Sequence, residues 1–184
     1  MKISAQRSGF TLVELLISVS IILILSGILI PSFSGYLNNQ NILQGVEQLK
    51  SDLRTLQNKA LTRVGADTGA KYWGLKIASD SANKYYFFNS TGNAQNPDCD
   101  LASTSTASVK LPGEVIIRNG PSAGSGFCVF FSIVNGDVNM VKPQGALSNR
   151  ISLGYAGSGS NCRAVEINSA GMMKLVNNVT CETN

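Results

Sequence analysis

The sequence predicts an α+β fold in which one long N-terminal α-helix packs on a mainly antiparallel β-sheet head. Two observations carry this prediction. An apolar run is followed directly by a segment whose apolar residues have helical spacing. The rest of the chain contains short aromatic and β-branched segments separated by turn-prone residues. One helix followed by a series of short strands is typical of the α+β class, and 184 residues allow one globular domain plus an extended element.

The apolar run covers residues 10–30, and Glu14 is its only ionisable side chain. As a helix, these residues would rise about 31 Å, which is enough to cross the hydrocarbon core of a bilayer. The leader, residues 1–9, carries Lys2 and Arg7 and no acidic residue, and this charge bias favours a cytoplasmic leader. We therefore expect residues 10–31 to form a transmembrane helix that enters the membrane from the cytoplasmic side.

Glu14 indicates that this helix is more than an anchor. A carboxylate within a membrane is costly unless it is paired, and no Lys, Arg or His occurs between Phe10 and Lys50. Cleavage after Gly9 would supply a partner, because Phe10 would then carry a free α-amine about one helical turn from Glu14. The same amine could reach Glu14 of a neighbouring, staggered copy. The pattern predicts that Glu14 sets the register between subunits.

The segment Gly9-Phe10-Thr11-Leu12-Val13-Glu14-Leu15-Leu16 resembles the processing and methylation site of type IV prepilins and type II secretion pseudopilins. The shared features are a small residue before the cut, an aromatic residue after it, Glu at the fifth mature position and a basic leader. The resemblance implies cleavage between Gly9 and Phe10 by a membrane-embedded prepilin peptidase, followed by N-methylation of Phe10. It also implies assembly with other pilin or pseudopilin subunits at an inner-membrane platform. Pro31 lies where many of these proteins have a helix-bending proline.

Two plainer interpretations of the apolar run are possible. A secretory signal peptide would need a small-residue cleavage site after the run, and residues 26–31 match such a site poorly. A signal peptide would also have no need for Glu14. The other interpretation is a plain single-span anchor in which Glu14 is accidental.

Residues 32–66 are predicted to continue the helix as an amphipathic segment packed on the head. Pro31 should bend or weaken the helix at the junction, because it removes one backbone hydrogen bond. A helix over residues 10–64 would be about 80 Å long and should end near Gly65. One face of the second half carries Ile42, Val46, Leu49, Leu53, Leu56, Ala60 and Val64. A coiled-coil seam is the alternative use of this face, although about three heptads are few for that purpose.

Residues 67–184 are predicted to form the β-rich head. The expected strands are 72–77, 84–88, 114–118, 127–134, 138–141, 151–155, 163–167 and 172–176. Asn135-Gly136 predicts a two-residue hairpin turn, and residues 169–171 should close the last hairpin. Residues 89–106 are poor in apolar side chains and are expected to be a long loop.

The four cysteines lie beyond the apolar run, at Cys99, Cys128, Cys162 and Cys181. An even number in an exported domain predicts two disulfides, and three pairings exist. We favour Cys162–Cys181, which would join the ends of a C-terminal hairpin and would leave Cys99–Cys128; free thiols are the alternative. The chain has no C-x-x-C pair and no histidine, which disfavours a zinc site.

The layout of the head resembles that of H-type minor pseudopilins and FimT-like minor pilins, and residues 164–174 are similar to their final hairpin. The resemblance implies a pilin-like fold and a minor subunit. FimT-like proteins that bind DNA carry arginines just after the glycine of that hairpin. This chain has Met172 and Met173 there, so a nucleic-acid partner is not expected.

Composition argues against catalysis. Without histidine, His-based nucleophilic triads and His metal ligands are excluded, and we expect no cofactor and no metal. The net charge is +4; loss of Lys2 and Arg7 with the leader would leave 13 basic against 11 acidic side chains. That small excess favours no polyanionic partner.

Two weaker ligand hypotheses arise in the head. Asn96, Asp98 and Asp100 offer oxygen ligands for calcium, although such clusters are also common turn formers. A basic and aromatic surface for single-stranded DNA could be formed by Lys71, Lys76, Lys84 and Lys110 near Tyr72, Trp73 and Tyr85. Solvated strand faces would explain the same lysines.

The sequence therefore predicts a structural subunit, of the minor type, of a type IV pilus or type II secretion pseudopilus, and not an enzyme. It would be held by lipid in the bacterial inner membrane, with the head outside the cytoplasm, before it enters the filament. One alternative is a minor pilin for DNA uptake or adhesion whose head binds a ligand. The other is an enzyme or receptor domain on a membrane anchor.

Overall fold

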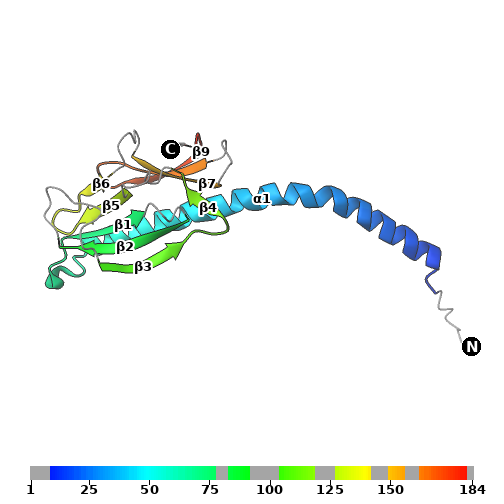
Figure 1. The fold of residues 1–184 in the computed structure, drawn as a ribbon, viewed down its shortest axis with the longest axis horizontal. Helices are drawn as coiled ribbons and strands as arrows, with labels where there is room; N and C mark the ends of the chain where they lie inside the picture. Colours follow the sequence, from blue (N-terminus) through cyan, green and yellow to red (C-terminus); the bar gives the residue numbers. More distant parts are fainter. Residues whose placement is uncertain are drawn as a thin grey trace, which may run out of the picture. The chain divides into compact units, whose positions relative to one another are not determined.

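The computed structural model describes residues 9–77, 83–91, 104–118, 127–141, 149–155 and 162–181. The chain divides into two compact units, Met1–Asn39 and Gln40–Asn184. The helix α1 (Leu12–Leu61) begins in the first unit and ends in the second (Figure 1). The boundaries expected after residues 9, 31 and 66 stay predictions. Within the described part of the chain, no helix is long and apolar enough to span a membrane.

The second unit combines the end of α1 with two antiparallel sheets, as expected for an α+β fold (Figure 1). The five-stranded sheet has the order β3-β2-β1-β5-β6, and the four-stranded sheet has the order β4-β7-β8-β9. The strands of the first sheet are β1 (Tyr72–Ile77), β2 (Lys84–Ser90), β3 (Thr104–Lys110), β5 (Phe127–Ser132) and β6 (Val138–Val141). Those of the second are β4 (Val115–Ile117), β7 (Arg150–Tyr155), β8 (Cys162–Ile167) and β9 (Met173–Val179).

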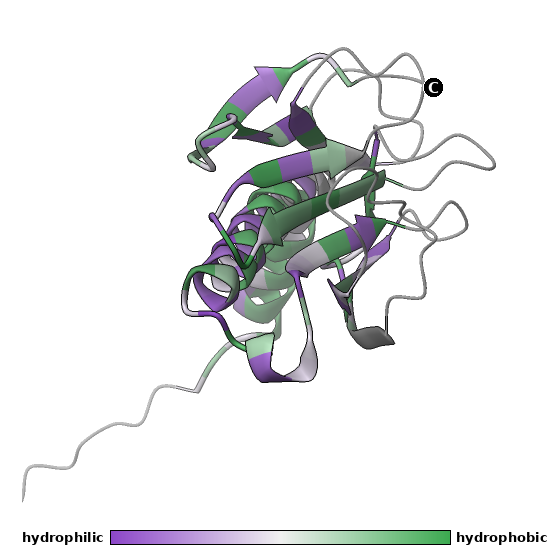
Figure 2. Ribbon diagram, turned by 90° about the vertical axis from the view of Figure 1, so that its left-hand side faces the viewer, coloured by the Kyte–Doolittle hydropathy of each residue, from purple (hydrophilic) through white to green (hydrophobic). Residues whose placement is uncertain are grey.

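The end of α1 and the inner faces of both sheets share one hydrophobic core. The expected helical face supplies Ile42, Val46, Leu49, Leu53, Leu56 and Ala60, each at most 4% exposed. Every second residue of β1, namely Trp73, Leu75 and Ile77, meets this face from the five-stranded sheet. In Figure 2, hydrophobic and hydrophilic residues alternate in colour along the ribbon of the helix and of the strands around it. The amphipathic helix therefore packs on the sheets, as predicted.

Val64 was expected on the buried face, and this was wrong. The helix ends at Leu61, and Arg63 takes a left-handed conformation with φ 55°, followed by Gly65 with φ 81°. The Val64 carbonyl accepts a hydrogen bond of 2.7 Å from Trp73 Nε1. Because the chain has already turned, the Val64 side chain is 46% exposed.

Two expectations about the strands also need correction. The predicted loop over residues 89–106 overlaps the end of β2 and the start of β3, which pairs with β2. As an edge strand, β3 needs few apolar side chains. Its low apolar content therefore led to the prediction of a loop. The β5–β6 hairpin exists, with Phe131 opposite Val138, but residues 133–136 connect it instead of a two-residue turn.

The disulfide between Cys162 and Cys181 is present, with a Cα–Cα distance of 5.2 Å. It lies on Gly154, where a Cβ atom would come within 2.5 Å of Cys162 Sγ. The glycine therefore makes room for the disulfide on the outer face of the four-stranded sheet. The other expected pair includes Cys99, which lies outside the described residues; Cys128 is buried in β5.

A polar interaction lies at the edge of the core. Tyr85 is fully buried, and its hydroxyl donates a hydrogen bond of 2.5 Å to Asp52 Oδ2 on α1. Burial, together with the charge of Asp52, raises the pKa of Tyr85 well above its usual range. The bond ties β2 to the helix through a phenol that stays protonated.

Replacing Leu53 by Ala should lower the free energy of unfolding of the second unit by about 2–5 kcal/mol, because it leaves a cavity in the shared core. Urea titration of the full chain in detergent, followed by fluorescence of Trp73, its single tryptophan, measures this. Ser51→Ala, on the exposed side of the same helix, is the control and should change little. Equal effects of the two substitutions would contradict this packing.

Stability should fall as the pH rises above about 10, partly through Tyr85. An unfolded Tyr ionises near pH 10, whereas folded Tyr85 keeps its proton, so the unfolded state binds fewer protons there. The loss from this residue should reach about 1.4 kcal/mol per pH unit. Tyr85→Phe should make the decline less steep in the same titration run between pH 9 and 11. An unchanged slope would show that Tyr85 ionises normally.

Candidate assembly site

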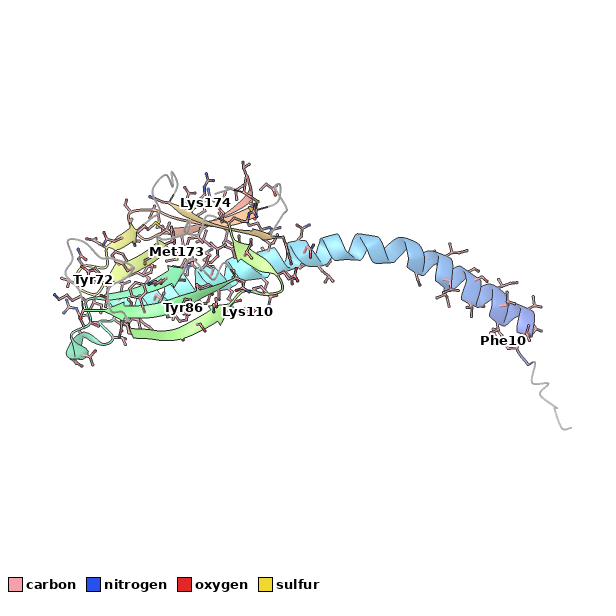
Figure 3. The ribbon with its side chains drawn as sticks, in the orientation of Figure 1. Phe10, Tyr72, Tyr86, Lys110, Met173 and Lys174 are labelled. Carbon is pink, nitrogen blue, oxygen red and sulfur yellow. A yellow bond between two sulfur atoms is a disulfide. The ribbon has the colours of Figure 1, made fainter. Side chains whose placement is uncertain are left out.

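The first unit presents an apolar helix surface that its described residues leave exposed. Residues of this kind with side chains 46–79% exposed are Phe10, Leu12, Val13, Leu15, Leu16, Ile17, Val19, Ile21, Ile22, Leu23, Ile24 and Leu25. They lie around the whole helix, and within residues 11–25 the polar residues are Thr11, Glu14, Ser18 and Ser20. Figure 3 shows their side chains projecting around α1 from Phe10 onward. A surface of this size requires burial against lipid or against other helices.

The polar side chains of this segment are satisfied within the helix. Ser18 Oγ donates to the Glu14 carbonyl at 2.7 Å, and Ser20 Oγ donates to the Leu16 carbonyl at 2.8 Å. Internal pairing of this kind removes the cost of placing a hydroxyl in an apolar environment. The serines are therefore compatible with a surface that becomes buried.

Thr11 and Glu14 form a reciprocal cap at the start of α1. Glu14 Oε2 accepts hydrogen bonds from Thr11 N at 2.9 Å and from Thr11 Oγ1 at 2.8 Å. In return, Glu14 N donates to Thr11 Oγ1 at 3.3 Å. This is a capping box, in which the residue before the helix and the third helical residue satisfy each other's amides. Thr11 was not singled out from the sequence, although the T-x-x-E spacing before an apolar run is its signature.

The cap leaves part of the Glu14 carboxylate available. Both bonds from Thr11 reach Oε2, and Oε1 accepts no hydrogen bond from the described residues. The side chain is exposed and held in one place by Thr11. Glu14 is thus a fixed acceptor on a helix whose other surface is apolar.

Gly9 and Phe10 precede the helix, and both are exposed. A Cβ atom added at Gly9 would meet nothing within 4 Å, so the packing of this chain does not require a glycine there. Pro31, the other residue expected to act in assembly, lies within α1. The cleavage, methylation and register roles of these residues stay predictions.

The basic and aromatic surface suggested for DNA is not formed by the expected aromatic residues. Tyr72, Trp73 and Tyr85 are at most 9% exposed and belong to hydrophobic clusters. Strand alternation instead places Lys76, Lys84, Tyr86 and Lys110 on the outer face of the five-stranded sheet, with Lys84 opposite Lys110. The possible calcium ligands Asn96, Asp98 and Asp100 lie outside the described residues.

An uncovered apolar helix with one fixed carboxylate near its start, in the same chain as a disulfide-containing β head, defines a pilin-type filament subunit. Comparison with known proteins agrees with this class. Residues 4–30 match the family model for the prokaryotic N-terminal methylation motif. The chain is also 33% identical over 119 residues to the type IV wide pilus major component PilA4 of Thermus thermophilus. The aligned region covers 55% of this chain and 91% of that protein.

The chain therefore belongs to the type IV pilin family. No solved structure matches it. Members of this family are structural subunits, which supports a role other than catalysis for this chain.

Thr11→Ala should weaken the start of α1 by about 1 kcal/mol, because the Glu14 amide loses its acceptor and Glu14 Oε2 loses one of its two donors, the Thr11 hydroxyl. Amide hydrogen exchange of the full chain in detergent micelles should then show Glu14 exchanging about fivefold faster. Thr11→Ser keeps the hydroxyl and serves as the matched control. Equal protection in the wild type and Thr11→Ala would remove the capping box from the account.

Proposed function

We propose that this chain is made as a membrane-inserted precursor, cut between Gly9 and Phe10, and assembled as a structural subunit of a type IV filament. The observation that carries the proposal is the uncovered apolar surface of residues 10–25 around a single fixed carboxylate. Such a surface must be covered, and identical helices packed side by side in a fibre would cover it.

The processing step rests on the exposed junction between residues 9 and 10. Because no described residue lies within 4 Å of a Cβ atom built at residue 9, its small size fits recognition by another protein, for which prepilin peptidase is the candidate. Cleavage would leave Phe10 with a free α-amine, and N-methylation at that nitrogen would complete the mature end. The match of residues 4–30 to the methylation motif supports this order of events.

Before assembly, residues 10–31 would lie in the lipid of the inner membrane, with the head outside the cytoplasm. The apolar surface suits lipid and neighbouring helices equally, so transfer from one to the other exchanges apolar contacts at little cost. Pro31 would loosen the helix as the subunit leaves the lipid. The inner-membrane assembly platform is the candidate partner for this transfer.

Glu14 would set the register of each incoming subunit. Its Oε1 atom is open to an ammonium group, and the α-amine of a processed Phe10 is the cation that the mature segment itself would supply. A misplaced subunit would leave a carboxylate unpaired among apolar helices, which is strongly unfavourable. Pairing Glu14 with the N-terminus of a neighbour would therefore select one stagger.

The chain could serve as a minor or as a major subunit of its filament. The expected similarity of the head to H-type pseudopilins and FimT-like pilins favours a minor subunit, whereas the relative from Thermus thermophilus is described as a major pilus component. The copy number of this chain in purified filaments, relative to the other subunits, decides between these assignments. The proposed Cys99–Cys128 disulfide would add a second covalent link in the head.

Glu14→Ala should be processed normally but should enter filaments at least about tenfold less than the wild type, because it lacks the charge that fixes the stagger. Immunoblots of sheared filaments and of the membrane fraction measure this, and intact mass establishes processing. Ser20→Ala changes an exposed polar residue of the same helix and should assemble normally. Filaments containing Glu14→Ala at the wild-type level would argue for a plain membrane anchor.

A further inference from the structure

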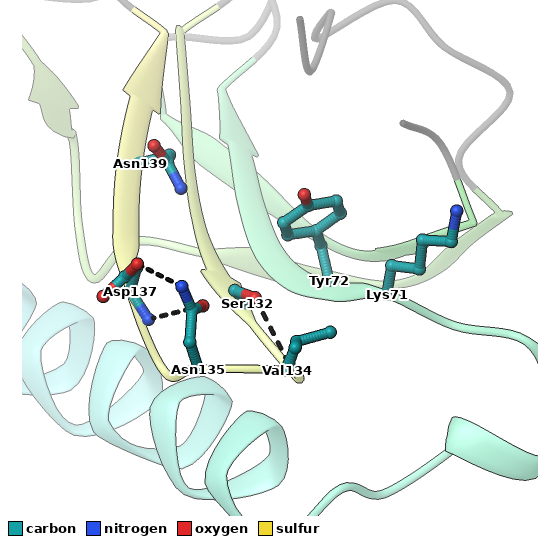
Figure 4. Close-up of a pocket in the computed structure, with 7 residues that line it drawn as sticks. All are labelled: Lys71, Tyr72, Ser132, Val134, Asn135, Asp137 and Asn139. Carbon is teal, nitrogen blue, oxygen red and sulfur yellow. Dashed lines mark hydrogen bonds between the residues drawn. The ribbon is translucent and has the colours of Figure 1, made fainter. Parts of the chain in front are cut away.

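A pocket of about 540 Å³ lies on the outer face of the five-stranded sheet, where β1 and β6 begin and β5 ends. Its lining includes Lys71, Tyr72, Ser132, Asn135, Asp137 and Asn139. Figure 4 shows Asn139 and Asp137 on one side of the pocket, and Tyr72 and Lys71 on the other. The volume is within the range of small-ligand sites.

Backbone pairing holds the walls of this pocket in place. Tyr72 lies opposite Ser132 across β1 and β5, and the Ser132 amide donates to the Asp137 carbonyl at 2.9 Å. The Ile133 amide donates to the Lys71 carbonyl, also at 2.9 Å. Three strand ends therefore fix the lining residues before any ligand arrives, which lowers the entropy cost of binding.

Several polar groups remain available to a ligand. The side-chain amide of Asn135 donates a hydrogen bond to Asp137 Oδ2. Asp137 Oδ1 and the side-chain amide of Asn139 have no hydrogen-bond partner among the described residues. Ser132 Oγ accepts a bond from the Val134 amide at 3.2 Å, so its hydroxyl proton can still be donated. Burial raises the pKa of Tyr72, which keeps its hydroxyl a donor.

The mixture of these groups indicates the chemistry of the ligand. The lining contains one cation, Lys71, and one anion, Asp137, so neither a multivalent cation nor a polyanion is favoured. Amide, hydroxyl and carboxylate groups supply both donors and acceptors, while Val134 and the ring of Tyr72 add an apolar wall. Tyr72 is braced by Phe130, with ring centroids 5.4 Å apart in an edge-to-face arrangement. This lining matches a ligand whose ring has apolar C–H faces and carries hydroxyl groups, because a hydroxyl group can both donate and accept hydrogen bonds.

We propose that this pocket binds a neutral saccharide, with Asp137 and Asn139 as its main hydrogen-bonding residues and Tyr72 as its apolar wall. Val134, Asn135, Asp137 and Asn139 are exposed, so the end of a longer glycan can enter from solvent. The head would then recognise a carbohydrate surface, whatever assembly carries it.

The test is saturation-transfer NMR of the full chain in lauryldimethylamine oxide, a detergent without a sugar head group. Lactose, maltose and chitobiose are the neutral probes, and glucuronate and glucosamine are the charged ones. At least one neutral disaccharide should receive saturation. Asn139→Ala should weaken its binding about tenfold through loss of an amide that pairs with the ligand.

Asp137→Asn keeps an oxygen for Asn135 but weakens the acceptor, and it should also reduce binding. Asn177→Ala, which removes an exposed amide from β9, is the matched control and should bind as the wild type does. Fluorescence of Trp73 shows whether each variant is folded. If Asn139→Ala is not folded, the comparison of Asp137→Asn with the wild type decides the test. Saturation of no neutral probe, preference for a charged probe, or binding unaffected by both pocket variants would overturn the proposal.

Discussion

The exposed apolar surface at the start of α1 determines what the first unit must contact. Exposed apolar area is unfavourable in water by roughly 25 cal/mol per Å², so a helical segment that is mostly apolar favours a cover. The serines within it bond to carbonyls of their own helix, and Thr11 holds Glu14 in place. These local bonds leave the apolar surface and one carboxylate oxygen as the features that another molecule can recognise.

One helix therefore meets two different needs along its length. Over residues 12–25 the helix is mostly apolar and exposed, whereas from Ile42 to Ala60 one face is buried against two sheets. That face belongs to a core which lies entirely within the second unit, so the head does not depend on the apolar segment for its packing. A subunit that exchanges lipid for neighbouring helices needs such independence, because the surroundings of its first segment change while its head must stay folded.

Periodicity and motif spacing made much of this fold predictable. Six of the seven residues predicted for the helical face pack on the sheets; the prediction failed at Val64 because the helix ends at Leu61 and Arg63 is left-handed. The edge strand β3 was not predicted, because apolar content indicates which segments are buried and an edge strand buries few side chains. Tyr85 was taken for a surface residue because a strand pattern alone does not say which face meets the core. The pocket beside Tyr72 was beyond prediction, since it depends on the register of β1 against the β5–β6 hairpin, which is distant from β1 in sequence.

Residues 10–25 are proposed to become the mature, buried end of a filament subunit. The most direct measurement is the intact mass and N-terminal sequence of the protein recovered from sheared filaments. We expect a chain that begins at N-methylated Phe10. A chain that begins at Met1, or one cut after the apolar run, would contradict it, and Glu14 would then need another explanation.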